Sequence, residues 1–355
     1  TAAVAPVSDN ITVPSFNRQT QQISWQPVTT AIRHETEAAV YEVKTTAGRT
    51  VTVTGDHSLF CLSDSGDIQE VAGGELETGD SIMVPKQIPT VGSSSASDTT
   101  ERMSSVAALC SETTTESLST DGGLQAKDAT DPSPDRLQTL LRSLINESRS
   151  ASSLSVAEQR ALTRSLATYV TSRGAIVPDH RQPISVNSAS SQTLSLFEMF
   201  DTCCTSDDGY TLPGFLFEVH PSAQRAFVAQ AFAVDVSDES VPQASVSVGT
   251  AHLLRELTTL CTQIGLTPQL TTADAVDADT GHTLTICPHE TNGPQQQSPQ
   301  SSHHVSPGSP LRNETIQEVT QVAQPDTVYD ISVPGATGAD ENFIIANEAP
   351  VFVKN

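Results

Sequence analysis

The stretch from Gly48 to Phe60 reads GRTVTVTGDHSLF, and it contains the second arm of a β-hairpin. Apolar and polar side chains alternate from Val40 to Thr45, Ala47 to Arg49 form a glycine-containing turn, and the β-branched run Thr50 to Thr54 returns. Alternation on both sides of a short turn is typical of a hairpin. The sequence therefore predicts a β-rich unit within residues 1–85.

Further strand patterns are closely spaced near both ends of the chain. They are residues 23–25, 31–32 and 81–84 near the N-terminus, and residues 327–333, 342–345 and 351–353 near the C-terminus. Each end is too small to bury an adequate core alone. We therefore favour one β domain, split by an inserted domain, over three independent domains.

The middle of the chain changes pattern. Leucines and an isoleucine recur at helical spacing between residues 135 and 174, residues 222–234 and 251–264 are further helix candidates, and residues 283–286 form a strand pattern. Residues 86–134 and 290–315 are rich in Ser, Thr, Asp, Gln and Pro, and are predicted to be disordered linkers. The predicted inserted α/β domain is therefore residues 135–289.

Composition limits the function classes. The chain has 42 acidic and 18 basic residues and a net charge of -24, a surface that repels nucleic acid. Acidic residues in folded and linker segments alike favour a high-salt cytoplasm over an acidic protein from an ordinary cell. The six cysteines are scattered without metal-site spacing, so we expect free thiols in a reducing compartment. No apolar run reaches spanning length and no signal sequence is present, which predicts a cytoplasmic protein without a membrane partner.

Several segments together resemble the Hint domain of inteins, the elements that excise themselves by protein splicing. Residues 48–60 resemble the family's Thr-x-x-His block, residues 328–335 and 341–355 resemble its two C-terminal blocks, and residues 76–85 also fit. The run Val13–Phe16, with Trp25 and residues 32–34, is most similar to inteins of archaeal family B DNA polymerases. A lone Thr-x-x-His is common by chance. The specificity comes from both pieces at opposite ends of a split β domain, in a chain whose last residue is Asn355.

The resemblance implies a role for each catalytic candidate. His57 would hold the scissile amide and protonate the leaving nitrogen, since an imidazole titrates near neutrality. Thr54 would donate a hydrogen bond to the same amide. Asp330 would tune the nucleophiles, although a strand-end aspartate also makes local turn contacts. Asn355 would attack its own main-chain carbonyl and close a succinimide ring, with both groups held in one residue.

Three positions depart from the family pattern. Residue 1 is Thr and the block that opens with Cys or Ser is not found, so we expect a missing N-terminal intein segment to be a partner. The penultimate residue, usually His, is Lys354, whose ammonium is a poor proton shuttle at neutral pH unless desolvation lowers its pKa. Glu341 stands where many relatives carry a His.

The predicted inserted domain resembles a LAGLIDADG homing endonuclease. Residues 213–217 and 224–235 look like the family's second motif, with Asp235 at the acidic position, and residues 253–266 resemble its following helix. In that family a helix from each half carries one acidic residue, and the pair binds divalent metal. Gln230 and Val236 replace the small residues of the motif. The nearest candidate for the first motif is Leu196–Asp201, which equally fits an ordinary amphipathic helix.

The fold class predicted from these features is a mainly β, horseshoe-like Hint domain interrupted by a degenerate α/β LAGLIDADG-like domain, with residues 316–355 returning to the Hint domain. The function expected is autocatalytic splicing from a host DNA polymerase, whose flanking exteins are the partners, with no cofactor. The alternatives are a site-specific DNA endonuclease, which would use Mg²⁺ at Asp235, and an inert insertion. DNA is the less favoured partner because of the acidic charge.

Overall fold

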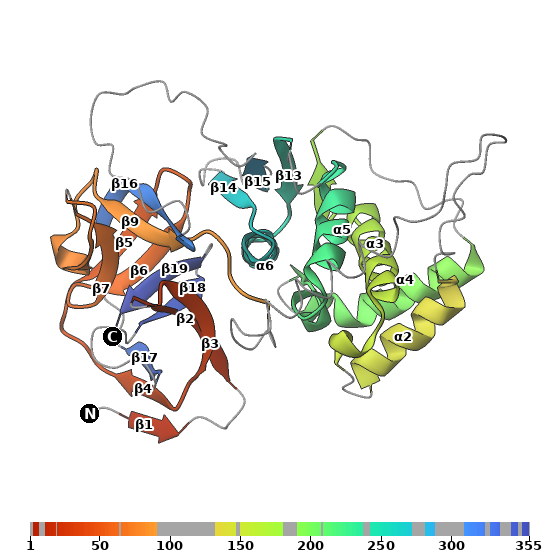
Figure 1. Ribbon diagram of the computed structural model, residues 1–355, viewed down its shortest axis with the longest axis horizontal. Coiled ribbons are helices and arrows are strands. Elements are labelled where there is room, and N and C mark those ends of the chain that lie inside the picture. The colour runs from red at the N-terminus through yellow and green to blue at the C-terminus, as the bar shows by residue number, and fades with distance from the viewer. Residues whose placement is uncertain are drawn as a thin grey trace, which may run out of the picture.

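The computed structural model describes residues 3–6, 11–18, 20–63, 65–90, 132–146, 150–179, 190–206, 209–236, 242–271, 281–287, 309–323, 327–333, 342–346 and 350–354. A β-rich unit is built from both ends of the chain, and an α/β unit is built from its middle (Figure 1). Segments far apart in the sequence therefore lie side by side in the β-rich unit.

An eight-stranded sheet forms the body of the β-rich unit. Its strands follow the order β18-β19-β7-β9-β16-β5-β6, and β8 pairs with β7 off this path. The bounds are β5 Val40–Thr45, β6 Thr50–Thr54, β7 Ser58–Leu62, β8 Ile68–Ala72, β9 Ser81–Pro85, β16 Leu311–Val322, β18 Asn342–Ala346 and β19 Pro350–Lys354. The predicted hairpin is present as β5 and β6, with Val40 opposite Thr54.

The long strand β16 joins the two ends of the chain. Its first half pairs with β9, with Leu311 opposite Pro85, and its second half pairs with β5, with Val322 opposite Val40. The register shifts between Ile316 and Glu318, and such a bulge bends a strand. One strand from the C-terminal part therefore completes the sheet begun by the N-terminal part.

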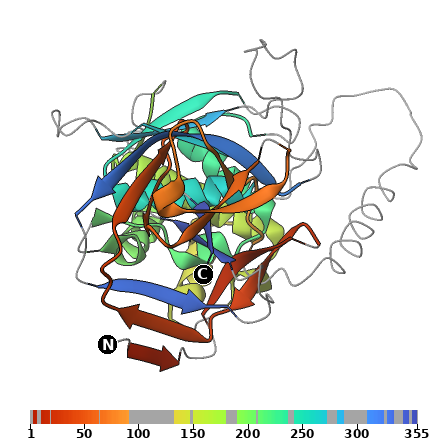
Figure 2. The same cartoon turned by 90° about the vertical axis from the view of Figure 1, so that its left-hand side faces the viewer.

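Two smaller sheets complete this unit. Strands β1 (Ala3–Pro6), β4 (Thr30–His34) and β17 (Val328–Ser332) form a three-stranded antiparallel sheet, and β2 (Thr12–Asn17) pairs with β3 (Gln22–Pro27). Figure 2 shows β1, β4 and β17 as red and blue arrows stacked along one edge of the unit. The mainly β character expected of the flanking segments is thus confirmed.

The β-rich unit has two apolar clusters. One lies around Val43, Leu59 and Val353, and the other around Phe16, Phe60 and Phe352. The rings of Phe16 and Phe352 are 5.9 Å apart between centroids, a favourable aromatic distance. Both clusters contain residues from both ends of the chain, so neither end has a core without the other.

The middle unit packs helices against a four-stranded antiparallel sheet of order β10-β13-β15-β14. Its helices are α2 Pro134–Asn146, α3 Val156–Ser172, α4 Ser191–Cys203, α5 Pro221–Phe232 and α6 Ala251–Gln263, and its sheet strands are β10 Ile176–Pro178, β13 Ala244–Val248, β14 Thr267–Thr271 and β15 His282–Cys287. Short pieces are the 3₁₀ turns at 151–153 and 214–217 and the hairpin of β11 Thr205–Ser206 with β12 Gly209–Tyr210.

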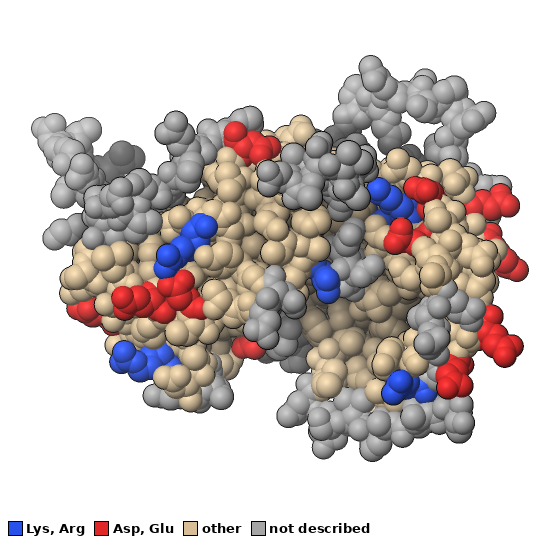
Figure 3. All heavy atoms as spheres, turned by 180° about the vertical axis from the view of Figure 1, so that it is seen from behind, with Lys and Arg blue, Asp and Glu red and all other residues tan. Residues whose placement is uncertain are grey.

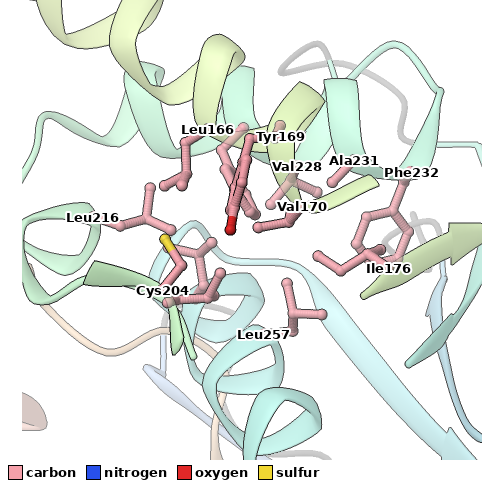
Figure 4. Packing of buried hydrophobic residues seen from close by; sticks show 14 of the residues in the cluster. Leu166, Tyr169, Val170, Ile176, Cys204, Leu216, Val228, Ala231, Phe232 and Leu257 are labelled. Carbon is pink, nitrogen blue, oxygen red and sulfur yellow. The ribbon is translucent and has the colours of Figure 1, made fainter. Parts of the chain in front are cut away.

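Local sequence explains where these helices begin. Ser155 and Glu158 form a reciprocal capping box at the start of α3, Thr250 caps α6, and Pro221 stands in the first turn of α5. The core of this unit gathers Leu166 and Tyr169 from α3, Val228 from α5 and Leu257 from α6 (Figure 4). Among the described residues, no helix is long and apolar enough to cross a membrane.

Both predicted linkers are shorter than expected. Within residues 86–134, the described part includes Ile88, which is 2% exposed, and helix α2, which starts at Pro134. Within residues 290–315, strand β16 starts at Leu311, so the C-terminal part of the sheet begins there and not at residue 316. Polar composition predicted these edges wrongly. Ile88 is held by burial, and residues 311–315 are held by the pairing of β16 with β9. The remaining residues of both linkers lie outside the described ranges.

The two units touch through backbone groups. The amide of Leu270 in β14 donates to the carbonyl of Ala47 in the β5–β6 turn at 2.8 Å. A Cβ on Gly48 would stand 2.0 Å from the Leu270 carbonyl oxygen, so the turn meets β14 at the one position without a side chain. Gln87 donates to the Gln263 carbonyl at the end of α6, and α6 also approaches β19. The sheet of the middle unit and α6 lie next to the β-rich unit in Figure 1.

Candidate functional site

The Thr-x-x-His residues lie in a tight turn between β6 and β7. The His57 amide donates to the Thr54 carbonyl at 3.1 Å, which closes the turn. Thr54 and His57 are both half-buried, whereas Asp56 between them is exposed. The turn thus places the first and last residues of the motif next to each other at the edge of the sheet.

The 3₁₀ turn Gly73–Glu75 packs against the Thr54–His57 turn and is hydrogen-bonded to it. The Gly73 amide donates to the His57 carbonyl at 2.8 Å, and the Gly74 amide donates to the Gly55 carbonyl at 3.0 Å. A Cβ on Gly73 would lie 2.7 Å from the Thr54 carbonyl oxygen. The close approach therefore requires glycine at position 73.

The end of the chain runs beside this turn. Strand β19 is antiparallel to β7, with Val353 opposite Leu59 and Lys354 opposite Ser58. Because Ser58 directly follows His57, the backbone of Lys354 is one residue pair away from the motif histidine. The structure thus brings Thr54, His57 and Lys354 together, whereas Asn355 and Glu341 lie outside the described residues.

Asp330 lies in a different sheet. It is on β17, opposite Ile32 of β4, and its Oδ1 accepts the amide of Ile331 at 2.7 Å. The carboxylate is half-buried. The described contacts tie this side chain to its own strand, as a local turn contact would, and they do not join it to the Thr54–His57 turn.

A buried ionic cluster holds the start of β19. Arg49 is 1% exposed; its Nε donates to Glu314 at 2.8 Å and its Nη1 donates to the Pro350 carbonyl at 2.9 Å. Thr45 donates to the other Glu314 oxygen at 2.9 Å, and Arg312 lies 2.7 Å from that carboxylate. Burial, and then the neighbouring Arg49, lower the pKa of Arg312 to about 10. A single carboxylate therefore faces two guanidinium groups.

A buried amide fixes the other end of the β18–β19 hairpin. Asn342 accepts the Phe16 amide at 2.9 Å and donates to the Phe16 carbonyl at 2.8 Å. Asn342 is opposite Lys354 in the hairpin and is fully buried. Its side chain thus pairs with the backbone of β2 as a neighbouring strand would.

The sequence interpretation missed Arg49, Gly73, Glu314 and Asn342. Arg49 stands at the end of a polar turn, where an arginine is ordinarily exposed, so nothing in its local sequence indicates burial. Glu314 lies between the polar residues Asn313 and Thr315 in β16, and it was placed in a linker. Their partners are more than 250 positions away for Arg49 and Asn342, so no local pattern could reveal them.

The acidic candidate of the middle unit lies outside its helix. Helix α5 ends at Phe232 and Ala233 adopts a left-handed conformation (φ 56°), so Asp235 stands three residues beyond the helix and is exposed. The predicted helix of residues 222–234 is therefore two residues too long at its end, and Asp235 lies outside it. The left-handed cap ends the helix before Val234, which was expected to be helical.

Helix α5 pairs with α3 and not with α4. The Thr163 hydroxyl of α3 donates to the Ala223 carbonyl of α5 at 2.9 Å, whereas α4, which contains Leu196–Asp201, packs on α2. At the end of α3 stands Arg173, whose guanidinium pairs with Asp201 at 2.6 Å. Within the described ranges, no group of three or more His, Cys, Asp or Glu side chains could hold a metal ion.

Both ends of the chain therefore build one β unit, and its Thr-x-x-His turn lies beside the last described strand. This is the arrangement expected of a splicing domain. Residues 8–355 match the family model of the intein splicing domain. The chain belongs to this family, and its function is protein splicing.

Relatives match shorter parts of the chain. It is 45% identical over 74 residues to a DNA polymerase of Thermococcus sp. (strain GE8) and 42% identical over 74 residues to that of Thermococcus hydrothermalis. Each match covers 21% of this chain and 4% of the relative. The solved KlbA intein precursor from Methanococcus jannaschii is 24% identical, with a TM-score of 0.23, over 24% of this chain and 47% of that one.

Proposed function

We propose that the Thr54–His57 turn and the end of β19 form the splicing centre, and that Asn355 is the residue that cyclises. The observation that carries this is the pairing of Lys354 with Ser58. Lys354, opposite Ser58, is the last described residue before residue 355, and one peptide bond spans about 3.8 Å between Cα atoms. The strand pairing thus supports contact between the reacting carbonyl and this turn.

The chemistry follows from the residue types. The side-chain nitrogen of Asn355 attacks the main-chain carbonyl carbon of the same residue, a C–N bond forms, and the peptide bond to the following residue breaks. At the upstream junction, His57 holds the scissile amide and protonates its leaving nitrogen. Thr54 donates a hydrogen bond to the same amide. Lys354 polarises the carbonyl. Asp330 lies in another sheet, so its role would be to act through its charge on nucleophiles that approach β17.

The test is a precursor that carries a reporter protein at each junction, with an N-terminal intein segment that contains the first nucleophile supplied in trans. We expect Asn355→Ala to abolish cleavage after residue 355, and His57→Ala to reduce cleavage at the upstream junction by about 100-fold, the usual contribution of a general acid. The matched control is His252→Ala, a histidine on α6 of the middle unit. Cleavage after residue 355 that persists in Asn355→Ala would refute the proposal.

We infer that the host is a DNA polymerase. The support is the match to the Thermococcus polymerases, of whose length the chain spans about 4%. The exteins of such a host would be the partners in splicing. Sequencing the gene on both sides of these codons tests this, since flanks that encode another protein would exclude the polymerase.

We propose that the middle unit is a degenerate LAGLIDADG-like domain without nuclease activity. A divalent metal needs acidic ligands at the ends of the paired helices. Here α3 ends at Arg173, a cation, and Asp235 lies beyond α5. Incubation with Mg²⁺ and plasmid DNA that carries the intein-free polymerase gene should give no nicking. Specific, Mg²⁺-dependent nicking would overturn this inference and assign Mg²⁺ as a cofactor.

We further propose that the surface is adapted to the concentrated salt of a haloarchaeal cytoplasm. The net charge of -24 supports this. Figure 3 shows acidic side chains on both halves of one face, with basic side chains only in isolated patches. Screening by salt reduces the repulsion among such charges.

A further inference from the structure

Strand β19 depends on a single buried side chain at its start. The Arg49 Nη1 group donates to the carbonyl of Pro350, the first residue of β19, while its Nε is bound to Glu314 of β16. The guanidinium therefore bridges β16, an interior strand of the sheet, and the strand that leads to residue 355. Its planar fork suits two partners at fixed angles.

The opposite end of β19 lies at the splicing centre. Lys354 pairs with Ser58 of β7 and with Asn342 of β18, which in turn holds Phe16. Pro350 and Lys354 are about 13 Å apart along a strand that rises about 3.3 Å per residue. Arg49 is thus remote from the reacting atoms, yet it fixes the hairpin that carries them.

Register is what this bridge controls. A slip of one residue in β19 would turn every side chain to the opposite face of the sheet and move residue 355 along β7. Pairing of β18 with β19 alone does not prevent this, because the hairpin can shift as one body. Asn342 holds one end of the hairpin to β2, and Arg49 holds the other end. The contact from Arg49 ties the hairpin to β16, which is paired with both β5 and β9.

We propose that Arg49 is a positioning residue for cleavage after residue 355, acting through the Pro350 carbonyl and β19. This inference rests on the proposed role of Asn355. The described contacts of Arg49 go to Thr45, Glu314 and Pro350, so we expect its effect on the C-terminal step and not on the upstream acyl shift.

Arg312 provides a matched control. It is also a largely buried arginine, and it lies 2.7 Å from the same Glu314 oxygen that Arg49 binds. The described contacts of Arg312 lead to Glu314 and not to Pro350. A conservative change at either arginine perturbs the same ion pair, but only the change at Arg49 removes the donor to β19.

The experiment uses the full precursor with a reporter at each junction, and an N-terminal intein segment that contains the first nucleophile is supplied in trans. We compare Arg49→Lys and Arg312→Lys for the rate of cleavage after residue 355, for hydroxylamine-induced cleavage at the upstream junction, and for the thermal midpoint. The expected result is at least a 10-fold slower C-terminal step in Arg49→Lys alone, with the upstream rate unchanged. Both variants should lose similar thermal stability.

Two results would overturn the proposal: an equal slowing in both lysine variants, or an equal slowing of both junctions in Arg49→Lys. If Arg49→Lys does not fold, Arg49→Gln takes its place with the same two readouts. The Asn355→Ala precursor separates the two ideas. C-terminal cleavage that persists there refutes the proposed centre, whereas its loss, together with wild-type rates in Arg49→Lys, refutes only the positioning role.

Discussion

At the residue scale, the buried cluster of Arg49, Arg312 and Glu314 is the least ordinary feature of the β-rich unit. Two guanidinium groups share one carboxylate away from water. Removing the carboxylate leaves two buried charges without a counter-ion, whereas removing one guanidinium leaves a balanced pair. The first change should lower the free energy of unfolding more than the second. The two kinds of charge in the cluster should therefore respond to substitution in opposite ways.

We predict that Glu314→Gln destabilises the protein by about 3–5 kcal/mol, because both arginines then lack a counter-ion. By contrast, Arg312→Met should be neutral or stabilising by about 1 kcal/mol. Burial lowers the pKa of Arg312 to about 10, so its charged form opposes folding at neutral pH and this cost falls as the pH rises through about 10. Urea unfolding at pH 7 measures both variants, and equal losses of stability would contradict the account.

The cysteines offer a second test at this scale. None of the five cysteines that the structure describes forms a disulfide. A hydrogen bond from the Cys204 thiol, 3.8 Å away, lowers the pKa of Cys203, whereas burial raises the pKa of Cys61 and of Cys261 to about 12. The thiolate is the reactive form of cysteine, and the two buried cysteines form it only at high pH.

We predict that iodoacetamide at pH 8 alkylates Cys203 and leaves Cys61 and Cys261 unmodified. Peptide mass spectrometry after timed labelling gives the rates for each cysteine. The matched variant Cys204→Ala removes the thiol donor and should slow labelling of Cys203 several-fold. Faster labelling of Cys61 than of Cys203 in the folded protein would show that burial does not control these thiols.

At the scale of elements, the splicing centre depends on two close approaches of backbone. The Gly73–Glu75 turn packs under the Thr54–His57 turn, and β19 pairs with β7. Neither contact involves a side chain of the motif. The position of His57 is therefore set by backbone neighbours from three segments.

We predict that Gly73→Ala destabilises the protein by about 1–3 kcal/mol, because a Cβ there overpacks against the Thr54 carbonyl. Since that oxygen belongs to the motif turn, upstream cleavage should also fall. The control is Gly249→Ala, where a Cβ meets nothing within 4 Å and stability should change by less than about 0.5 kcal/mol. Thermal unfolding and the two-reporter precursor provide the measurements, and wild-type behaviour of Gly73→Ala would contradict the geometry.

At the scale of the whole molecule, charge and the contact between units dominate. The middle unit meets the β-rich unit at the β5–β6 turn and at β19, the same two places that Arg49 links. Acidic side chains lie on both halves of one face of the molecule (Figure 3). Stability of the whole chain should therefore depend on ionic strength more than on any one pair.

We predict that the thermal midpoint rises with KCl, because the Debye length falls from about 8 Å at 0.15 M to about 3 Å at 1 M and repulsion within a net charge of -24 is screened. A parallel series in sucrose is the control, because sucrose raises stability without screening charges. The difference between the two series gives the part of the shift in midpoint that is due to screening. A midpoint that does not change between these KCl concentrations would reject the salt-adapted surface.

The sequence by itself determined the hairpin of β5 and β6, the helices of the middle unit and the family, because these depend on periodicity, turn residues and short motifs. Prediction from the sequence failed where a residue's structure depends on a segment far away in the chain. The linker edges at Ile88 and Leu311, the exit of Asp235 from α5, and the pairing of α5 with α3 all depend on packing between distant segments.

Only the tertiary structure placed Lys354 beside the Thr54–His57 turn and set Asp330 apart in another sheet. It alone revealed Arg49 as the link between Glu314 and Pro350. The physical reason is the same in each case. A local pattern records which face of an element is buried, but strand register and buried ion pairs are fixed by groups hundreds of residues away.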